Sequence, residues 1–277
     1  MPPPPASHPL PDAWDCHAHL FGPYARFPLA PDRSYTPPPA TIEAYDAMLG
    51  GLGLARGVLV HPSAYGDDFS LLFEALERRP AWRGVAVLRE ADAATLKALR
   101  ARGVRALRFS HRSGAGANFA GSASFDDLLA LAAGMADAGL HAELWTDCAS
   151  LPALAPRIAG LPVAVVFDHM GGFDATQSID EPGFAALRGL LERGPAWVKL
   201  CAYRSLAGRS DATAGRAHHR ALIESQPERV VWGTDWPHLR VDPVPDTAAL
   251  LRTMIDWTAD DEQVARILRS NPARLYA

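Results

Sequence analysis

The segment WDCHAHL, residues 14–20, begins the regular part of this sequence and has the pattern of a β-strand. Alternate side chains of a strand point to the same side of a sheet. We therefore expect Asp15, His17 and His19 to face one way and the residues between them to face the other. Two imidazoles on one face can ligate a metal or donate to an oxygen atom, although an isolated pair of histidines is more often structural. The rest of the chain decides between these interpretations.

Seven more apolar segments, rich in β-branched residues, follow this first strand. The predicted strands cover residues 13–20, 57–60, 84–88, 104–109, 141–145, 163–169, 197–202 and 230–234. Amphipathic segments rich in alanine and leucine lie between them at helical spacing, at residues 41–52, 69–78, 92–102, 125–138, 150–158, 182–192, 214–224 and 246–257. A last predicted helix covers residues 260–269. Eight strands that alternate with helices predict an α/β fold in which a parallel sheet closes into a (β/α)8 TIM barrel.

The length of 277 residues suits a single barrel domain, which we place at residues 12–277. A doubly wound open sheet is the alternative fold, but no glycine-rich dinucleotide fingerprint follows any predicted strand. Residues 1–11 are rich in proline and lack the basic and apolar regions of a signal peptide. We therefore expect an N-terminal arm there, outside the domain.

The composition limits the partners of the protein. A net charge of −4 without a long basic run gives no footprint for nucleic acid or an anionic membrane, and no apolar run is long enough to cross a bilayer. The three cysteines, Cys16, Cys148 and Cys201, are widely spaced, which favours free thiols in a reducing cytoplasm. Either a monomer or a homodimer is compatible with this sequence.

A TIM barrel carries its chemistry at the carboxyl ends of its strands and in the loops that follow them. Polar and titratable residues collect at those ends in this sequence, while the strand bodies are mostly apolar. The residues are His17, His19, His61, Ser63, Arg108, Ser110, Trp145, Asp147, Asp168, His169, Arg204, Asp235 and His238. Core packing explains such a distribution poorly, so the sequence predicts an active site that contains His17 and His19.

Three motifs carry a family resemblance: DCHAHLFGP at residues 15–23, FDHMGG at 167–172 and GTDWPH at 233–238. Together they resemble the amidohydrolase superfamily, and within it the lactonase branch typified by 2-pyrone-4,6-dicarboxylate lactonase. The similarity continues through residues 27–37 and 271–276, and so covers nearly the whole chain. The resemblance implies a (β/α)8 hydrolase that opens a lactone, an ester bond within a ring. It also implies that four residues surround the reacting carbonyl, namely His17, His19, His169 and Asp235.

The resemblance leaves the cofactor open. In many superfamily members the corresponding four positions bind a divalent metal, commonly zinc, that activates water, and three histidines with one aspartate suit zinc. In the lactonase branch the reaction is understood to need no metal, and we expect none here. A zinc ion held by the four residues is the alternative. The predicted strand five contains no lysine, so a binuclear site is not expected.

The chemistry of lactone opening agrees with these residues. The reaction needs a nucleophilic water, stabilisation of charge on the carbonyl oxygen, and protonation of the leaving oxygen. Asp235 is a suitable general base, while His17, His19 and His169 can polarise the carbonyl. His238, in the loop after the eighth strand, is a candidate to orient the base or to contact substrate. Asp15 is a candidate to fix a histidine tautomer.

The arginines indicate an anionic small-molecule substrate. Arg108 alternates with apolar neighbours and so points into the barrel, where a cation needs an anionic partner. That partner is a substrate carboxylate or, as the alternative, an internal salt bridge. Arg204 and the loop residue Arg112 are further candidates. The expected substrate-binding residues, including positions that match the family's substrate-lining residues, are Tyr35, His61, Ser63, Arg108, Trp145, Arg204 and His238.

The chain also departs from the family pattern. The dicarboxylate binder has an arginine just after the DHMG motif, where this chain has Gly172 and Phe173, and a tyrosine where this chain has Trp145. Fewer cations predict a lactone with fewer carboxylates or a sugar-acid lactone. A lactone isomerase or a zinc-dependent decarboxylase with the same residues is the alternative enzyme. A catalytically silent binding protein agrees poorly with the complete set of three histidines and Asp235.

Overall fold

The computed structural model describes residues 12–113, 119–207, 209, 211 and 213–277. The predicted arm at residues 1–11 and residues 114–118 of the loop after the fourth strand lie outside the described residues.

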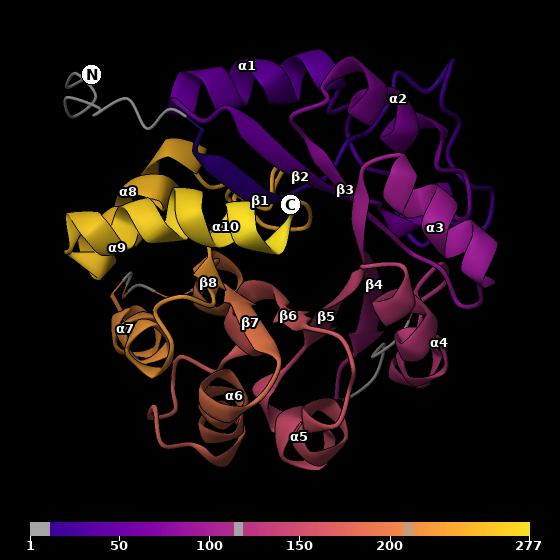
Figure 1. Ribbon diagram of the computed structural model, residues 1–277. Coiled ribbons are helices and arrows are strands. Elements are labelled where there is room, and N and C mark those ends of the chain that lie inside the picture. Colours follow the sequence, from indigo (N-terminus) through magenta and orange to yellow (C-terminus); the bar gives the residue numbers. More distant parts are fainter. Residues whose placement is uncertain (1–11, 114–118, 208, 210, 212) are drawn as a thin grey trace.

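Eight parallel strands form one sheet in the order of the sequence. They are β1 (Trp14–Ala18), β2 (Arg56–Val60), β3 (Arg83–Ala86), β4 (Val104–His111), β5 (His141–Thr146), β6 (Val165–Phe167), β7 (Ala196–Lys199) and β8 (Val230–Val231). The segment after β8 closes the sheet onto β1, since the Asp235 N–H donates to the His17 carbonyl at 2.8 Å and the His19 N–H to the Trp236 carbonyl at 2.8 Å. Figure 1 shows the strands at the centre with helices around them. The predicted TIM barrel is confirmed.

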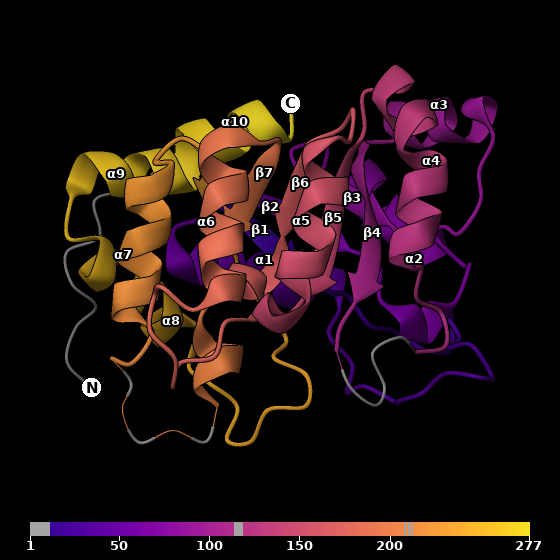
Figure 2. The ribbon, with the colours of Figure 1, turned by 90° about the horizontal axis from the view of Figure 1, so that it is seen from below.

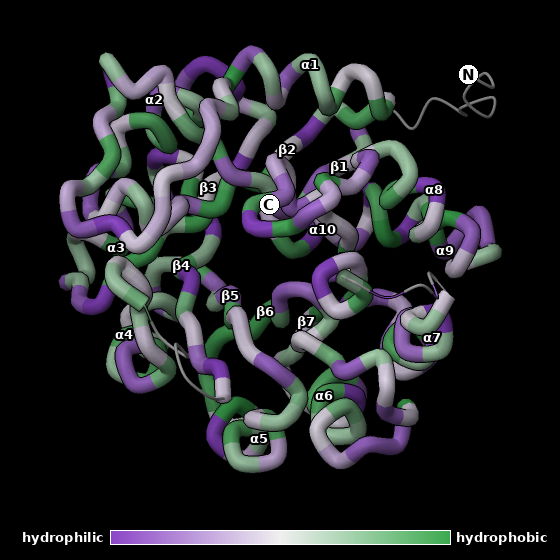
Figure 3. Tube along the Cα trace, turned by 180° about the vertical axis from the view of Figure 1, so that it is seen from behind, coloured by the Kyte–Doolittle hydropathy of each residue, from purple (hydrophilic) through white to green (hydrophobic). Residues whose placement is uncertain are grey.

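Amphipathic helices cover the outside of the barrel. They are α1 (Ile42–Leu52), α2 (Ser70–Arg78), α3 (Ala93–Ala101), α4 (Phe125–Asp137), α5 (Leu151–Ala159), α6 (Pro182–Arg193), α7 (Arg216–Ser225), α8 (Thr247–Thr258), α9 (Asp261–Ala265) and α10 (Asn271–Leu275). Hydrophobic and hydrophilic residues alternate along them, as Figure 3 shows, because one side packs on the strands and the other faces solvent. No helix in the described ranges is both long and apolar enough to span a membrane.

Short helices form several of the loops. They are η1 (Ser63–Tyr65), η2 (Cys148–Ser150), η3 (Asp168–Gly172), η4 (Tyr203–Leu206) and the π-helical η5 (Arg266–Ser270). The predicted end of the last helix, at residue 269, is wrong, because helical structure continues from α9 through η5 into α10. Proline is tolerated at the first positions of a helix, where its missing N–H costs nothing, and Pro272 occupies such a position in α10.

The inner face of the barrel is packed mostly by apolar side chains from the strands. This inner cluster consists of Trp14, Cys16, Val58, Val60, Val85, Ala106, Val166, Trp197, Val231 and Tyr276. Tyr276 is the one member of this cluster that does not come from a strand. It follows α10 near the C-terminal end of the chain and is fully buried. Figure 2 shows α10 and the C-terminus at the end of the barrel where the strands begin, opposite the loops that follow the strands. The C-terminal end therefore closes the amino-terminal end of the barrel.

Strand β1 corrects one prediction. Its register with β2 shifts between Asp15 and Ala18, which indicates an extra residue in β1. Cys16 belongs to the inner cluster and His17 also faces inward, whereas the Asp15 carboxylate lies on the helix side and accepts a hydrogen bond from Tyr45 of α1 at 3.0 Å. The predictions that Asp15 shares a face with His17 and fixes a histidine tautomer are therefore wrong, because a bulge interrupts the alternation.

Candidate active site

A pocket opens at the carboxyl end of the barrel, where the sequence predicts the active site. Nine of the predicted site residues line it: His19, Tyr35, His61, Ser63, Arg108, Trp145, His169, Arg204 and Asp235. His17 lies beneath them and is fully buried. His238 is also buried, and its ring packs against Tyr203 with the ring centres 5.4 Å apart. The structure therefore places His238 behind the pocket wall.

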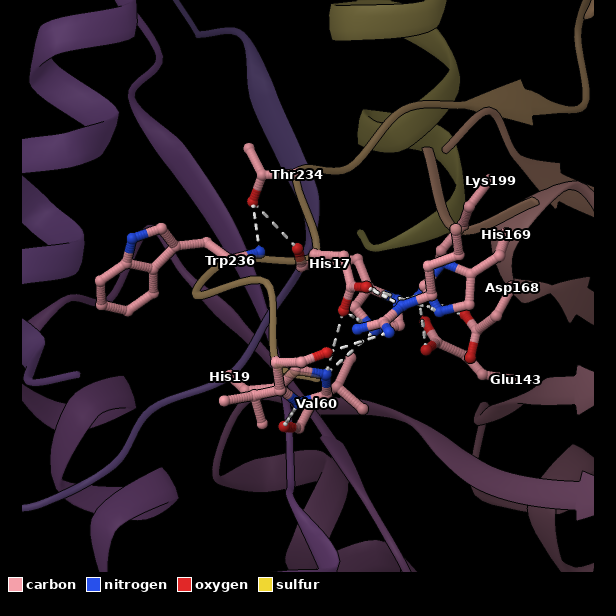
Figure 4. Close-up of polar contacts among 12 residues, drawn as sticks. His17, His19, Val60, Glu143, Asp168, His169, Lys199, Thr234 and Trp236 are labelled. Carbon is pink, nitrogen blue, oxygen red and sulfur yellow. Dashed lines mark hydrogen bonds and ion pairs between the residues drawn. The ribbon is translucent and has the colours of Figure 1, made fainter. Parts of the chain in front are cut away.

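His19 and Asp235 form the floor of the pocket, and His17 lies directly beneath them. The Nε2 atoms of the two histidines lie 3.3 Å apart. The Oδ1 atom of Asp235 lies 3.6 Å from Nε2 of His17 and 3.4 Å from Nε2 of His19. The other ring nitrogen of His19, Nδ1, is 2.8 Å from the carbonyl oxygen of Val60. Figure 4 shows His17 between His19 on one side and a group of charged residues on the other.

His169 and Asp235 both have left-handed backbone conformations, with φ of 50° and 58°. Such conformations are unusual for residues other than glycine and are concentrated at functional sites. In the turn after β6 the left-handed conformation continues through Met170 and Gly171. At Gly172 a Cβ atom would approach the Thr146 carbonyl oxygen to 2.5 Å, so this turn has no room for a side chain there. The two turns direct His169 and Asp235 into the same pocket.

The two carboxylate oxygens of Asp235 have different surroundings. Oδ2 accepts hydrogen bonds from the Tyr203 hydroxyl, at 2.7 Å, and from Nε of Arg204. Oδ1 is buried and has no hydrogen-bond partner within the described chain. Burial alone would raise the pKa of Asp235, but His169, which becomes charged when acid protonates it, and the permanent Arg204 cation hold that pKa well below its usual value. Asp235 is therefore a carboxylate, and Oδ1 is the oxygen that can accept a proton.

The buried histidines are poor proton acceptors. Burial lowers the pKa of His17 well below its ordinary value, and the nearby Lys199 ammonium lowers it further. Burial likewise lowers the pKa of His169 and of His61 to about 4 each. Near neutral pH these rings are uncharged, so each carries one N–H group that can donate to a substrate or protein oxygen.

A buried ionic layer lies directly below the pocket. Lys199 Nζ lies 2.5 Å from Glu143 Oε2, 3.1 Å from Asp168 Oδ1 and 3.1 Å from His17 Nδ1. Nε of Arg108 donates to Asp168 Oδ2 at 2.9 Å, so the internal salt bridge considered for Arg108 is present while its side chain still lines the pocket. Burial would raise the pKa of Asp168, but the Lys199 and Arg108 cations hold it well below its usual value. Asp168 is therefore ionised.

Lys199 and Glu143 are absent from the predicted site, because the sequence pattern treats their strands as apolar. A signal for Lys199 exists: the chain has only two lysines, Lys97 and Lys199, and Lys199 lies in a strand next to buried Val198. A lysine in such a strand needs an anionic partner, and Glu143 in β5 is the inward-facing carboxylate that provides it.

The outer wall of the pocket contains a cation that the sequence pattern does not predict. Arg240, in the loop after β8, lines the pocket and lies over the ring of Tyr35, with its guanidinium carbon 4.6 Å from the ring centre. It forms no ion pair with a carboxylate among the described residues. Burial raises the pKa of Tyr35, while a hydrogen bond with Ser63 and the charges of Arg108 and Arg240 act on that pKa in the opposite direction. The signal available in the sequence is only its position, two residues after His238.

One part of the pocket wall is aromatic. Trp145 lines the pocket, and the guanidinium carbons of Arg108 and Arg112 lie 5.3 and 4.8 Å from the centre of its ring. Arg112 itself is exposed and is not among the described pocket-lining residues. A flat face beside a cation suits a planar or nearly planar anionic ligand.

Two overlapping groups of ligand atoms could hold a metal ion. One consists of His17, His19 and Asp235, and the other of His17, Asp168 and His169, with the ligand atoms of each group within 4.8 Å of one another. Both sets contain the nitrogen and oxygen ligands that zinc accepts. The unpartnered Oδ1 of Asp235 would be available to such an ion. The residues present therefore fit a single divalent metal.

The closed eight-stranded barrel, with histidines and carboxylates converging at its carboxyl end, defines a (β/α)8 enzyme. The chain belongs to the amidohydrolase family, whose model, described as Amidohydrolase, matches residues 14–277. The family resemblance predicted from the three motifs is confirmed.

Several curated relatives act on lactones according to their names. The chain is 32% identical over 273 residues to 4-sulfomuconolactone hydrolase of Hydrogenophaga intermedia, covering 96% of this chain and 89% of that protein. It is 34% identical over 277 residues to 2-pyrone-4,6-dicarboxylate hydrolase of Comamonas testosteroni, covering 95% and 90%. It is 29% identical over 280 residues to D-galactarolactone isomerase of Agrobacterium fabrum, again covering 95% and 90%. A solved apo structure from Agrobacterium tumefaciens matches with a TM-score of 0.84 at 27% identity, covering 96% of this chain and 95% of that one.

Proposed function

We propose that this protein hydrolyses a lactone that carries one or two acidic groups. The relatives named as lactone hydrolases support the reaction class. The observation that carries the proposal is the unpartnered Oδ1 atom of Asp235, which faces the Nε2 atoms of His17 and His19 at the floor of an arginine-lined pocket. A proton acceptor and imidazole groups converge on one point, as the attack of water on an ester requires.

The proposed reaction begins when Asp235 takes a proton from a water molecule as the water oxygen attacks the lactone carbonyl carbon. The carbonyl electron pair moves onto the carbonyl oxygen, and N–H groups of His17 and His169 stabilise the resulting oxyanion, while the Nδ1 proton of His19 stays bound to the Val60 carbonyl. When the oxyanion collapses, the bond from the carbonyl carbon to the ring oxygen breaks. The proton held by Asp235 passes to that oxygen. The product is an open-chain hydroxy acid, and Asp235 is again a carboxylate.

A divalent metal is the alternative source of electrophilic assistance. His17, His19 and Asp235 would hold it, with His169 close by, and it would polarise the carbonyl and acidify a bound water. We propose instead that no metal is needed, because the charges around the site already balance. Three carboxylates are matched by three cations in the described chain: Glu143, Asp168 and Asp235 with Lys199, Arg108 and Arg204. A dication would add two positive charges without a carboxylate left to neutralise them.

The walls of the pocket support an anionic substrate. Arg108 and Arg204 line it beside the floor, and Arg240 lines its outer wall near Tyr35 and Ser63. The expectation of fewer carboxylates depends on the missing cation after the DHMG motif, and Arg240 supplies a cation from a different loop. We therefore propose that a carboxylate lies between Arg108 and Tyr35 and that Arg240 is placed to bind a second acidic group.

Lactone isomerisation is the second candidate, favoured by the similarity to D-galactarolactone isomerase. An isomerase would use Asp235 to move a proton without incorporating water. The two reactions are separated by running turnover in water labelled with oxygen-18. Hydrolysis places one labelled oxygen in the product, whereas isomerisation places none.

The experiment that tests the proposal is a lactone panel on purified protein of measured metal content, with and without chelator. The panel contains 2-pyrone-4,6-dicarboxylate, 4-sulfomuconolactone and galactarolactone. We expect hydrolysis of at least one lactone that persists after chelation, and a fall of about 100-fold or more in kcat for Asp235→Asn. The matched control is Asp174→Asn, since Asp174 is an exposed carboxylate outside the pocket that bonds within its own turn, to Thr176. Loss of activity on chelation contradicts the metal-free mechanism, and unchanged turnover in Asp235→Asn contradicts the base.

We also propose a cytoplasmic location and a role in the breakdown of aromatic or sugar acids. The three cysteines, which are buried and unpaired, support a reducing compartment. The lactones named for the relatives support the metabolic role. A monomer and a homodimer remain the two proposed states of assembly, which sedimentation of the purified protein separates.

A further inference from the structure

We propose that Lys199 is a positioning residue that holds the proton of His17 on Nε2, where it points into the pocket as a hydrogen-bond donor. The inference deepens the proposed function, since it assigns a direction to one of the groups that polarise the carbonyl. It concerns a residue buried in the body of β7, below the pocket.

The contacts of Lys199 leave little freedom for its ammonium group. The side chains of Lys199, Glu143 and Asp168 are all fully buried, and Nζ lies between the two carboxylates. The third neighbour of Nζ is Nδ1 of His17, at 3.1 Å. An ammonium has only donors, so a hydrogen bond between these atoms requires Nδ1 of His17 to accept. A neutral imidazole with an accepting Nδ1 carries its proton on Nε2.

The other side of His17 leads to the same assignment when His19 carries a single proton. Nδ1 of His19 lies 2.8 Å from the Val60 carbonyl, which can only accept, so Nδ1 of His19 carries a proton. Nε2 of a neutral His19 is then an acceptor. It lies 3.3 Å from Nε2 of His17, and this contact is a hydrogen bond only if His17 donates. Figure 4 shows this line of residues, from Lys199 through His17 and His19 to Val60.

One other arrangement is possible at His17. Oδ1 of Asp168 lies 3.2 Å from Nδ1 of His17, and Nδ1 could donate to it. That contact does not have hydrogen-bond geometry, since Oδ1 of Asp168 has no hydrogen-bond partner in the described chain, whereas the contact of Nδ1 with Lys199 does. The charge of Oδ1 is instead balanced by Lys199 Nζ, at 3.1 Å. The difference matters for function. With the proton on Nδ1, the lone pair of Nε2 would face the pocket, where it repels an oxyanion and can bind a metal.

The position of Lys199 depends in turn on the C-terminal end of the chain. The Tyr276 hydroxyl donates to Oε1 of Glu143 at 2.8 Å, while Oε2 of the same carboxylate binds Lys199. Tyr276 is the penultimate residue and enters the barrel from the end opposite the pocket. A continuous series of contacts therefore runs from the C-terminus through Glu143 and Lys199 to His17.

Nitrogen-15 NMR of histidine side chains tests the proposal, because the two neutral tautomers have different nitrogen shifts. The His17 signal is assigned by its loss in His17→Gln, and the metal content of the same sample is measured. We expect the Nε2–H tautomer in the full-length protein as isolated. The Nδ1–H tautomer, or a metal bound to Nε2 of His17, overturns the proposal, and this readout needs no substrate. An absence of lactone turnover would count against the proposed function alone.

The variant Lys199→Met/Glu143→Gln removes the cation together with its carboxylate partner, which avoids leaving a single buried charge. We expect its His17 to shift towards Nδ1–H and its kcat to fall about 100-fold, with KM changed by less than about threefold. The control is Lys97→Met, which removes the exposed lysine of α3 and should change neither reading. An unchanged tautomer in the folded double variant overturns the role of Lys199. If that variant does not fold, Tyr276→Phe, which removes only the hydroxyl bond to Glu143, must still weaken the Nε2–H preference.

Discussion

The Asp15 carboxylate accepts two hydrogen bonds from Thr234, one from the backbone N–H at 2.8 Å and one from Oγ1 at 2.7 Å. These bonds join β1 to the segment after β8, where the barrel closes. They also lie immediately beside the proposed catalytic residues, because Asp235 follows Thr234 and the N–H of His17 donates to Asp15 at 3.1 Å. The residue expected to orient an imidazole instead holds together the two segments that carry the site.

The same carboxylate makes stability depend on pH. Burial raises the pKa of Asp15 from 3.8 to about 6, against the effect of its hydrogen-bond donors. A carboxyl whose pKa is raised by folding adds stability below its unfolded pKa and loses that contribution as pH rises through the folded value. The shift of about two units corresponds to about 3 kcal/mol, lost between about pH 4 and pH 6.

We therefore expect Asp15→Asn to remove this loss, since an amide is neutral at every pH in that range. The variant should therefore gain stability relative to the wild type as pH rises. Its free energy of unfolding minus that of the wild type should increase by up to about 3 kcal/mol between pH 4 and pH 7. Urea unfolding at a series of pH values measures this difference. A difference that does not change with pH would show that Asp15 is ionised throughout the range.

Gly233 provides a second test of the junction between β1 and β8. A Cβ atom on Gly233 would lie 2.7 Å from both the backbone nitrogen and the Cβ of His17, so β1 would have to move. Overpacking of this kind costs about 1–3 kcal/mol. We expect Gly233→Ala to lose that much stability in urea unfolding and to lower kcat as well. In contrast, Gly50→Ala on the exposed side of α1 meets nothing within 4 Å and should gain about 0.5–1 kcal/mol. Equal effects of the two substitutions would refute the steric interpretation.

The barrel and most of the pocket could be predicted from the sequence because both follow from simple periodic patterns. Buried strands of a parallel sheet are continuous apolar runs, and their carboxyl ends meet at one edge, so residues such as His61 and Asp235 converge by topology alone. The ends of the strands follow less directly from the sequence pattern. The regular strand β8 covers only Val230–Val231, because the following residues turn towards β1, where Cys16 donates to the Trp232 carbonyl and Thr234 donates to Asp15.

The remaining features depend on three-dimensional packing that local sequence does not encode. The bulge in β1 places Asp15 and His17 on different faces of the sheet. Nothing in the alternation of residues in that strand indicates an extra residue. The pairing of Lys199 with Glu143 joins residues 56 positions apart, and it becomes visible only when β5 and β7 are placed in one barrel. Arg240 reaches the pocket through a loop whose path no periodic pattern describes.

The contact of Arg204 with Asp235 leads to a prediction about the pH dependence of activity. The Arg204 cation is one of the charges that hold the pKa of Asp235 well below its usual value, so Arg204→Gln should raise it. A general base works only when ionised, and therefore activity should begin to fall at a higher pH as the solution is acidified. The pH profile of kcat/KM, which reports groups of the free enzyme, measures the shift. Arg252→Gln, on the surface of α8, is the control with an unchanged profile. A profile of Arg204→Gln that falls at the same pH as the wild type would contradict the link between the two residues.

Arg240 leads to the prediction that selects the substrate. Its guanidinium lines the outer wall of the pocket, over Tyr35, without a carboxylate partner among the described residues. If it binds a second acidic group, Arg240→Gln should lower kcat/KM for a dianionic lactone such as 2-pyrone-4,6-dicarboxylate by about tenfold or more, the value of one charge-assisted hydrogen bond. A lactone with a single carboxylate should lose much less, since the carboxylate between Arg108 and Tyr35 remains bound. Arg216→Gln, at an exposed position of α7 outside the pocket, controls for the change in net charge. Equal losses for both lactones would show that Arg240 attracts anions only through its long-range charge and does not contact a second acidic group. The substrate of this pocket would then need only one acidic group.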